Sequence, residues 1–420
     1  MEQSDKQLRC GLLGQGLGHS FSPQLHALLG DYRYDCFECP PQELESFLRE
    51  GAWDAVNVTM PYKKAVLPYC AEVSETVKRL GCVNVLLRRA DGSLYGDNTD
   101  YDGFRYMVER SGFAVAGETV LVLGSGGASA TACAVLRELG AEVQVLSRNG
   151  GQCYGDLTPY RHARYIVNTT PLGMYPNNGT AAVDLRSFPR CRGVLDVIYN
   201  PAKTAIMLQA EELGIPAQGG LAMLTAQAVQ ASARFTGRTL PESLAEELCQ
   251  TFEKRQQNII LIGMPGCGKS TLSAELGRRM GRTVEEADAA VEERLGCSAA
   301  QWLTERGEDS FRTAETQVLR ELGKRTGRIL ATGGGCVVRA ENYPLLHQNG
   351  VIFWVRRELD KLETCNRPLS QGNLRELYER REPLYARFAD FTVDNNGTVG
   401  EAVEELRRLY FLGASPEETF

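Results

Sequence analysis

Two glycine-rich loops of different design stand out in this 420-residue sequence. One is GMPGCGKS at residues 263–270, which follows the apolar run NIILI and leads into TLSAELGRRM. The other is GSGGA at residues 124–128, which follows TVLVL and leads into an alanine-rich stretch. A glycine-rich loop between a strand and a helix offers backbone N–H groups to phosphate. The sequence therefore predicts two separate phosphate-binding sites in one chain.

The downstream loop fits the pattern G-x-x-x-x-G-K-[ST] at every required position. In this pattern the lysine reaches the β and γ phosphates, and the serine hydroxyl ligates magnesium. The loop therefore predicts a site for ATP and Mg²⁺. Its expected nucleotide-binding residues are Gly263, Gly266, Gly268, Lys269, Ser270 and Thr271.

The upstream loop has the spacing G-x-G-G-A, which is typical of dinucleotide binding but also occurs in glycine-rich turns that bind no ligand. The next strand ends in VLSRN, with Arg148 where an acidic residue would hold the ribose of NAD. An arginine there can pair with a 2′-phosphate, so the site favours NADP(H). Its expected residues are Gly124, Gly126, Gly127, Ala128 and Arg148.

Polar stretches upstream of this loop add candidate substrate contacts. Ser20 and Ser22 stand two apart before a proline, and such hydroxyls either clasp a small carboxylate or cap a helix. Lys63 follows a strand-like run, and Asp100 lies in GDNTDYDGF. A lysine and an aspartate brought together can transfer a proton beside a reacting carbonyl. Taken singly, each could also be a surface lysine or a turn aspartate.

The elements that must position these groups alternate between strand-like and helical runs. Strand-like runs occupy 8–14, 55–60, 82–89, 119–127 and 142–147, and NIILIG restarts the pattern after a helix at 242–257. Such alternation predicts an α/β fold with parallel sheets and crossover helices. We expect the main domain boundary near residue 255 and a subdivision within 101–118.

Composition and charge narrow the class of protein. Hydrophobic residues make up 43% and charged residues 24%, as in ordinary globular proteins. A net charge of −7 without runs of like charge disfavours nucleic acid or a membrane surface as partner. No transmembrane helix or signal peptide is expected, and the thirteen cysteines are interpreted as reduced thiols. These features predict a cytoplasmic protein that acts on small molecules, as a monomer or a homodimer.

Residues 8–250 resemble the shikimate dehydrogenase family in the order and spacing of their motifs. Besides the stretches above, they share NVTxPxK, NTTPLGM at 168–174, DVIYNPAKT at 196–204 and GLAMLTAQA at 220–228. The resemblance implies reduction of 3-dehydroshikimate to shikimate by NADPH. It implies a catalytic lysine at Lys63 with its partner Asp100, carboxylate-binding serines at Ser20 and Ser22, ring-hydroxyl contacts at Thr59, Asn84 and Gln227, and nicotinamide neighbours at Tyr199 and Met223.

Two departures from that family concern the cofactor. The chain has SRN where the family has NRT, which changes one of the residues that assist binding of the 2′-phosphate. The segment 149–167 is short and glycine-rich, although the family places a helix and a strand there. We therefore expect a trimmed dinucleotide domain.

Residues 257–410 resemble the shikimate kinase family. The resemblance implies that Asp288 takes the acceptor hydroxyl and that Arg367 covers the phosphates from a lid. Shikimate itself would be held by Arg312, Arg381 and the Gly334–Gly335 turn. The family has the motif D-x-D where this chain has Glu286-Ala287-Asp288. The expected metal ligands are therefore Ser270 and Glu286, whose side chain is longer than the aspartate of the family. The stretch after Arg367 is short for a lid.

Together the resemblances imply a bifunctional shikimate-pathway enzyme. The implied domains are 1–104 for substrate binding, with closing helices 220–255 returning to it, 105–219 for NADP and 256–420 for a P-loop kinase with a parallel sheet. Two alternatives stay open: a metabolite sensor on the same folds without catalysis, and a quinate-type dehydrogenase in the first half.

Overall fold

The computed structural model describes residues 7–148, 154–362 and 374–412. The chain forms two compact units. The first comprises Met1–Met174, Thr180–Asn200 and Ile206–Phe252, and the second comprises Tyr175–Gly179, Pro201–Ala205 and Glu253–Phe420.

The first unit begins with a six-stranded mixed sheet in the order β2-β1-β3-β5-β6-β4. β1 pairs in parallel with β2 and β3, whereas β5 is antiparallel to both its neighbours. Its strands are β1 Arg9–Gly14, β2 Arg33–Glu38, β3 Ala55–Val58, β4 Glu72–Val73, β5 Val85–Arg88 and β6 Leu94–Asp97. The accompanying helices are α1 Ser22–His26, α2 Leu44–Glu50 and α3 Glu75–Leu80.

A second sheet of the first unit has five strands, all parallel, in the order β11-β10-β9-β7-β8. Its strands are β7 Thr119–Leu123, β8 Glu142–Leu146, β9 Tyr165–Asn168, β10 Gly193–Asp196 and β11 Ala217–Gly219, with helices α5 Gly127–Glu138 and α6 Ala205–Glu212. Between β8 and β9 the described residues form only a 3-10 turn at Thr158–Tyr160. The short connection expected from the sequence is therefore present, because these residues are too few and too rich in glycine for a crossover helix.

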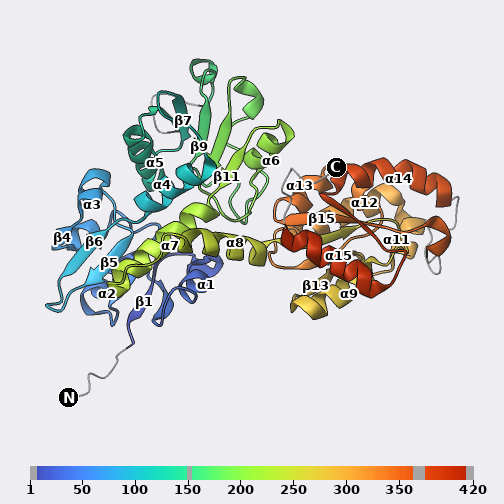
Figure 1. The fold of residues 1–420 in the computed structure, drawn as a ribbon, viewed down its shortest axis with the longest axis horizontal. Helices are drawn as coiled ribbons and strands as arrows, with labels where there is room; N and C mark the ends of the chain where they lie inside the picture. The colour runs from blue at the N-terminus through green and yellow to red at the C-terminus, as the bar shows by residue number, and fades with distance from the viewer. Residues whose placement is uncertain (1–6, 149–153, 363–373, 413–420) are drawn as a thin grey trace. The chain divides into compact units, whose positions relative to one another are not determined.

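Two long helices pack side by side along the first unit, α4 Asp100–Ser111 and α7 Leu221–Thr236 (Figure 1). Their close approach depends on Gly103, where a Cβ atom would lie 2.6 Å from the carbonyl oxygen of Met223. α7 also contacts α1 and β5, so it returns to the first sheet late in the sequence.

The second unit has a five-stranded parallel sheet in the order β13-β14-β12-β15-β16. Its central strand NIILI is wholly buried, as expected of a parallel strand covered on both faces. The strands are β12 Asn258–Ile262, β13 Val284–Glu286, β14 Ile329–Ala331, β15 Gly350–Arg356 and β16 Phe391–Asp394. The helices are α9 Lys269–Met280, α10 Ala287–Leu295, α11 Ala299–Arg306, α12 Glu308–Leu322, α13 Asn342–His347, α14 Leu374–Phe388 and α15 Val399–Leu412.

Helix α8, Leu244–Gln256, has residues in both units. Leu248 and Phe252 belong to a buried apolar cluster of the first unit. The last turn belongs to the second unit, where Arg282 donates to the carbonyl oxygens of Lys254 at 2.6 Å and Gln257 at 2.7 Å. Only Gln257 separates the helix from β12.

The α/β fold class predicted from the sequence is confirmed, but the first sheet is mixed rather than wholly parallel, and several strands are shorter than their predicted runs. The run 55–60 is a strand only to Val58, since the following residues turn away from the sheet around Pro61. The run 82–89 pairs only over Val85–Arg88. Within the described part of the chain, no helix is long and apolar enough to cross a membrane.

Candidate active sites

Lys63 and Asp100 lie together in the first unit although 37 positions separate them. Lys63 stands five residues beyond β3, and Asp100 is the first residue of α4. The Lys63 Nζ atom donates to Asp100 Oδ2 at 2.5 Å, and the two side chains are 25% and 13% exposed. The pair is thus shielded from bulk water but still reachable, as a proton-transfer group must be.

Asn84 fixes the start of α4 beside that pair. Its Oδ1 atom accepts the backbone N–H of Thr99 at 2.7 Å, and its Nδ2 atom donates to Thr99 Oγ1 at 3.1 Å. Asn84 is 3% exposed. Its side-chain amide therefore positions the residue immediately before Asp100.

Ser20 and Ser22 lie near the start of α1, and their hydroxyls are 3.2 Å apart. The N-cap position of α1 is Phe21, so neither serine is the N-cap, although Ser20 Oγ also accepts the backbone N–H of Ser22 at 3.2 Å. The Tyr199 ring lies 5.3 Å from that of Phe21 between centroids. Burial raises the pKa of the Tyr199 phenol, and the Ser20 hydroxyl opposes that shift. The structure therefore brings Ser20, Ser22 and Tyr199 together.

The other predicted substrate contacts of the first unit come from β3 and α7. Thr59 follows β3, and its backbone N–H donates to the carbonyl oxygen of Leu13 at 2.9 Å. Gln227 is buried on α7 and donates to the carbonyl oxygen of Leu224 at 2.8 Å. Met223 lies one turn earlier on α7, where its carbonyl faces Gly103 of α4.

The dinucleotide loop joins β7 to α5 at the carboxyl edge of the parallel sheet. Gly124 has φ +111°, and a Cβ atom there would lie 2.8 Å from Thr169 Oγ1. Gly126 and Gly127 instead have open space around the Cβ position, with Ala128 following in the first turn of α5. No side chain caps α5, so its first N–H groups are available to a pyrophosphate.

Arg148 is exposed just beyond β8, with no acidic residue beside it in the sequence. If Arg148 binds the 2′-phosphate, Arg148→Ala should raise the KM for NADPH about 10- to 100-fold, because a charge-assisted hydrogen bond is lost. Steady-state rates with NADPH and NADH would show this, since use of NADH should barely change. Arg161→Ala, at another exposed arginine of the same unit, is the control. Equal losses with both cofactors would remove Arg148 from the 2′-phosphate site.

The P-loop joins β12 to α9 in the second unit. Lys269 is 8% exposed, and its Nζ atom donates to the carbonyl oxygens of Gly263 at 2.9 Å and Met264 at 3.0 Å. Gly268 has φ +97°, and a Cβ atom there would lie 2.5 Å from Asn395 Nδ2. Asn395 also donates to the carbonyl oxygen of Cys267 at 2.7 Å. Asn395, which follows β16 and which the sequence did not single out, thus holds the loop in place.

Oxygen donors suited to magnesium lie beside the P-loop lysine. Ser270 Oγ donates to Glu286 Oε2 at 3.0 Å, and Ser273 Oγ donates to Glu286 Oε1 at 3.2 Å. Thr271 follows on the same helix and is exposed. Hydroxyl and carboxylate oxygens are the ligands that Mg²⁺ prefers. Ser270 and Glu286 therefore fit the expected metal site, and the longer glutamate still reaches the serine.

Glu286→Gln should raise the Mg²⁺ concentration needed for half-maximal kinase activity about 10-fold, because it removes a charge that orients the ion. Magnesium titrations at saturating ATP would measure this. Glu285→Gln is a matched control, since Glu285 pairs instead with Arg325 at 2.7 Å. Dehydrogenase activity of the same sample should be unchanged. An unaltered magnesium titration would exclude Glu286 from the site.

The acceptor side of the second unit gathers around the glycine turn 333–335. A Cβ atom at Gly333 would lie 2.4 Å from Asp288 Oδ1, and one at Gly335 would lie 2.2 Å from the Arg312 guanidinium. Arg381 donates to the carbonyl oxygen of Gly334 at 3.1 Å. One carboxylate and two guanidinium groups therefore face the same turn.

Glu315 joins this group; it stands in the charged stretch GEDSFRTAE at 307–315 with Arg312, but sequence analysis assigned it no role. Arg312 donates to Glu315 Oε2 at 2.8 Å, and both side chains are buried. Burial raises the pKa of Glu315, the Arg312 guanidinium opposes that shift, and the Asp288 charge adds to it. Only the three-residue spacing from Arg312 could have indicated this carboxylate. Arg367, the expected lid residue, lies outside the described residues.

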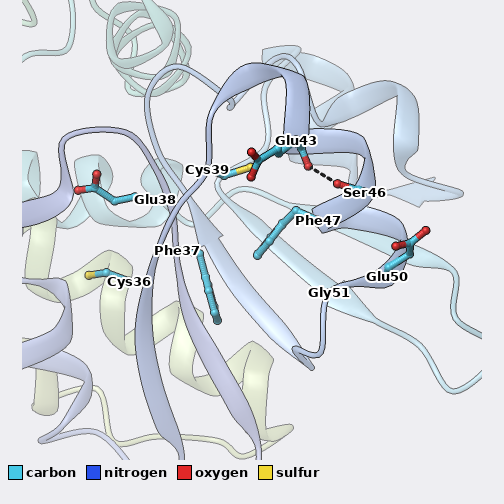
Figure 2. A pocket seen from close by; sticks show the side chains of 9 residues that line it. All are labelled: Cys36, Phe37, Glu38, Cys39, Glu43, Ser46, Phe47, Glu50 and Gly51. Carbon is cyan, nitrogen blue, oxygen red and sulfur yellow. Dashed lines mark hydrogen bonds between the residues drawn. The ribbon is translucent and has the colours of Figure 1, made fainter.

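A surface hollow of about 490 Å³ lies over β2 and α2 (Figure 2). It contains no predicted site residue, but Cys36 and Cys39 line it with the C-x-x-C spacing of many redox pairs. Cys36 lies in the extended strand β2 and Cys39 directly follows its last residue, so about 10 Å of extended chain separates the two Cα atoms. Disulfides need Cα atoms within about 7 Å. The eleven cysteines among the described residues are all free thiols.

Comparison with known protein families matches residues 12–86 to the shikimate dehydrogenase substrate binding domain and residues 265–410 to shikimate kinase. The shikimate dehydrogenase (NADP(+)) of Clostridium perfringens strain 13 is 32% identical over 268 residues, covering 58% of this chain and 98% of that protein.

Solved structures agree with this assignment. Shikimate 5-dehydrogenase from Thermus thermophilus, in complex with NADP(H) and shikimate, is 32% identical with a TM-score of 0.53, over 58% of this chain and 99% of that one. Quinate dehydrogenase from Corynebacterium glutamicum in complex with NAD is 28% identical with a TM-score of 0.53, over 59% and 98%. The chain therefore belongs to the shikimate dehydrogenase family, with a shikimate kinase domain fused on its C-terminal side.

Proposed function

We propose that this chain is a bifunctional enzyme that reduces 3-dehydroshikimate to shikimate with NADPH and then phosphorylates shikimate with ATP. The observation that carries the proposal is that one chain holds both a shielded Lys63–Asp100 pair and a P-loop beside an arginine-rich acceptor site. The relatives named above support the first activity, and the matched kinase domain supports the second.

In the first unit, Lys63 donates the proton that the C3 carbonyl oxygen needs as it becomes a hydroxyl. Bound NADPH supplies the hydride to the carbonyl carbon. Asp100 holds the Lys63 ammonium at 2.5 Å, which fixes both its charge and its direction. Ser20 and Ser22 bind the substrate carboxylate, while Thr59, Asn84 and Gln227 bind ring hydroxyls. Met223 and Tyr199 border the nicotinamide.

In the second unit, Asp288 accepts a hydrogen bond from the shikimate 3-hydroxyl and so orients its oxygen. Arg312 and Arg381 bind the carboxylate of shikimate, since a guanidinium fork matches that group bidentately. Bound ATP with Mg²⁺ supplies the phosphoryl group. Lys269 offsets negative charge on the β and γ phosphates, and Ser270 with Glu286 holds the metal. We also assign Arg367 to the phosphates.

The two reactions act on the same substrate oxygen. The hydroxyl that Lys63 completes is the one that Asp288 orients for phosphorylation. The first product is therefore the second substrate without further chemistry, which gives a physical reason for two phosphate-binding loops in one chain.

We propose three functional segments: 1–104 with 220–255 for substrate binding, 105–219 for NADP and 256–420 for the kinase. The six-stranded sheet ends at Asp97, and the dinucleotide sheet runs from Thr119 to Gly219. Contacts of α7 with α1 and β5 support the return of the later helices to the first segment.

A coupled assay tests the function. With 3-dehydroshikimate, NADPH, ATP and Mg²⁺, NADPH oxidation should be followed by formation of ADP in equal amount, with shikimate 3-phosphate as the product. Without ATP, shikimate should accumulate. No NADPH oxidation and no ADP would favour a sensor, and faster turnover of quinate with NAD would favour a quinate-type dehydrogenase.

A further inference from the structure

Tyr385 is a fully buried tyrosine of α14 whose hydroxyl contacts the glycine turn 333–335. The hydroxyl donates to the carbonyl oxygen of Gly334 at 2.5 Å. Its ring stacks on that of Trp354 in β15, at 5.9 Å between centroids and 24° between planes. Burial raises the pKa of this phenol, although the nearby Arg381 charge opposes the shift, so the hydroxyl keeps its proton at neutral pH. Tyr385 is therefore a fixed hydrogen-bond donor to the turn.

Arg381 reaches the same carbonyl from the same helix. It lies four residues before Tyr385, on one face of α14, and its Nη1 atom donates to the Gly334 oxygen at 3.1 Å. Arg381 is 2% exposed, and its Nε atom has no hydrogen-bond partner among the described residues. A buried guanidinium with an unused N–H is suited to an anionic ligand. Because Tyr385 also holds the carbonyl, Arg381 does not have to hold it alone.

The turn is closely packed against the P-loop. A Cβ atom at Gly334 would lie 2.6 Å from Pro265 Cδ, so only glycine fits at this contact. The Tyr385 hydroxyl lies 3.8 Å from Met264 Sδ in the same loop. Tyr385 therefore lies where the nucleotide loop meets the acceptor turn.

The peptide between Gly334 and Gly335 has one group that is held and one that is free. Tyr385 and Arg381 both donate to its carbonyl oxygen. Its N–H group, that of Gly335, has no acceptor within the part of the chain that the structure describes. Because a trans peptide is planar, this N–H points away from the carbonyl. Holding the carbonyl therefore sets the direction in which the free N–H can donate to a ligand.

We propose that Tyr385 is a positioning residue of the kinase site, whose hydroxyl holds the Gly334 carbonyl and thereby orients the Gly335 N–H toward shikimate. The proposal rests on the proposed function, because it assumes that shikimate binds at this turn. Tyr385 is fully buried, so its effect on the substrate must pass through the peptide. Without the hydroxyl, the carbonyl would compete with the shikimate carboxylate for the Arg381 guanidinium.

Tyr385→Phe removes only the hydroxyl and keeps the stacked ring. It should raise the KM for shikimate about 3- to 10-fold, as expected from the loss of one net hydrogen bond, with kcat and the KM for ATP little changed. Titration calorimetry of shikimate in the presence of ADP should show the same fold increase in Kd. Reduction of 3-dehydroshikimate by the same sample should be unchanged.

Two other tyrosines of the same unit provide matched controls. Tyr410 is 1% exposed, and its hydroxyl donates to the carbonyl oxygen of Lys254 at 2.5 Å, so Tyr410→Phe removes an equally buried hydroxyl away from the turn. Tyr378 lies on α14 itself, and its hydroxyl donates to Glu382 at 2.7 Å. Tyr410→Phe and Tyr378→Phe should both leave the KM for shikimate unchanged, even where thermal unfolding shows a loss of stability.

The two KM values separate positioning from a general structural role. An unchanged KM for shikimate in Tyr385→Phe, a matching rise in its KM for ATP, or the same rise for shikimate in Tyr410→Phe would each overturn the proposal. The last two results would indicate a general loss of packing rather than a misdirected peptide. Failure of the unaltered protein to phosphorylate shikimate would instead contradict the proposed function.

Discussion

Lys63→Ala should lower the rate of 3-dehydroshikimate reduction by about 10²–10⁴-fold, the usual contribution of a general acid, and leave phosphorylation of added shikimate intact. The reason is local: the Lys63 ammonium is the partner of Asp100 at 2.5 Å, and alanine leaves that carboxylate without its cation and the substrate carbonyl without a proton donor. The loss of NADPH absorbance, beside an ADP assay on the same sample, would measure both activities.

Lys64→Ala is the matched control for that variant. Lys64 is the next residue and is exposed, whereas Lys63 is half-buried against Asp100. We expect near-normal reduction with Lys64→Ala. Similar losses from both variants would mean that the segment is merely sensitive to substitution. A folded Lys63→Ala protein that keeps full reductase activity would remove Lys63 from catalysis.

Lys269→Ala should lower shikimate phosphorylation by about 10²–10³-fold, as expected when a group that stabilises transition-state charge is removed. Lys269 is the P-loop lysine, and its ammonium is buried against the loop carbonyls of Gly263 and Met264. The variant should reduce 3-dehydroshikimate normally and accumulate shikimate even with ATP and Mg²⁺ present. Chromatography of the products with time would show the accumulation.

Lys324→Ala, which breaks only a pair with Glu321 at 3.3 Å on the same unit, should keep kinase activity. Mixing the Lys63→Ala and Lys269→Ala proteins should restore full conversion through free shikimate. The length of the lag before shikimate 3-phosphate forms, compared with the unaltered protein, would show whether that protein passes shikimate directly from one site to the other. If either single variant loses both activities while circular dichroism shows it folded, the assignment of one lysine to each reaction is wrong.

Local chemistry explains what the sequence could predict. A glycine loop after a buried strand needs no distant contact to be recognised, so both phosphate loops and the strands before them could be placed from the residues alone. The trimmed β8–β9 connection could also be predicted, because residues 149–167 are too few and too rich in glycine for a full helix; the strand β9 at Tyr165–Asn168 is nevertheless formed.

Pairings across long sequence separations could not be predicted from the residues themselves. The family resemblance implies that Lys63 and Asp100 form a pair. The reason for their proximity appears only in the sheet order, in which β3, before Lys63, and β6, before Asp100, both lie beside β5. Glu315 had only a weak signal, its place three residues after Arg312 in a charged stretch, since a glutamate on a helix is common in any fold. Its significance comes from its burial and from its contact with the Arg312 guanidinium.

Helix α8 has a practical consequence for dividing the chain into two separately expressed proteins. A cut after Phe252 would split the helix and leave Lys254, which donates to the carbonyl oxygen of Tyr410 at 2.9 Å, on a frayed stub at the start of the second half. A cut after Gln257 would leave the first half with helix-end carbonyls that Arg282 no longer satisfies. Each of these two cuts therefore removes hydrogen bonds from one half. Although only Gln257 separates α8 from β12, the two halves are harder to express as separate proteins than this short connection suggests.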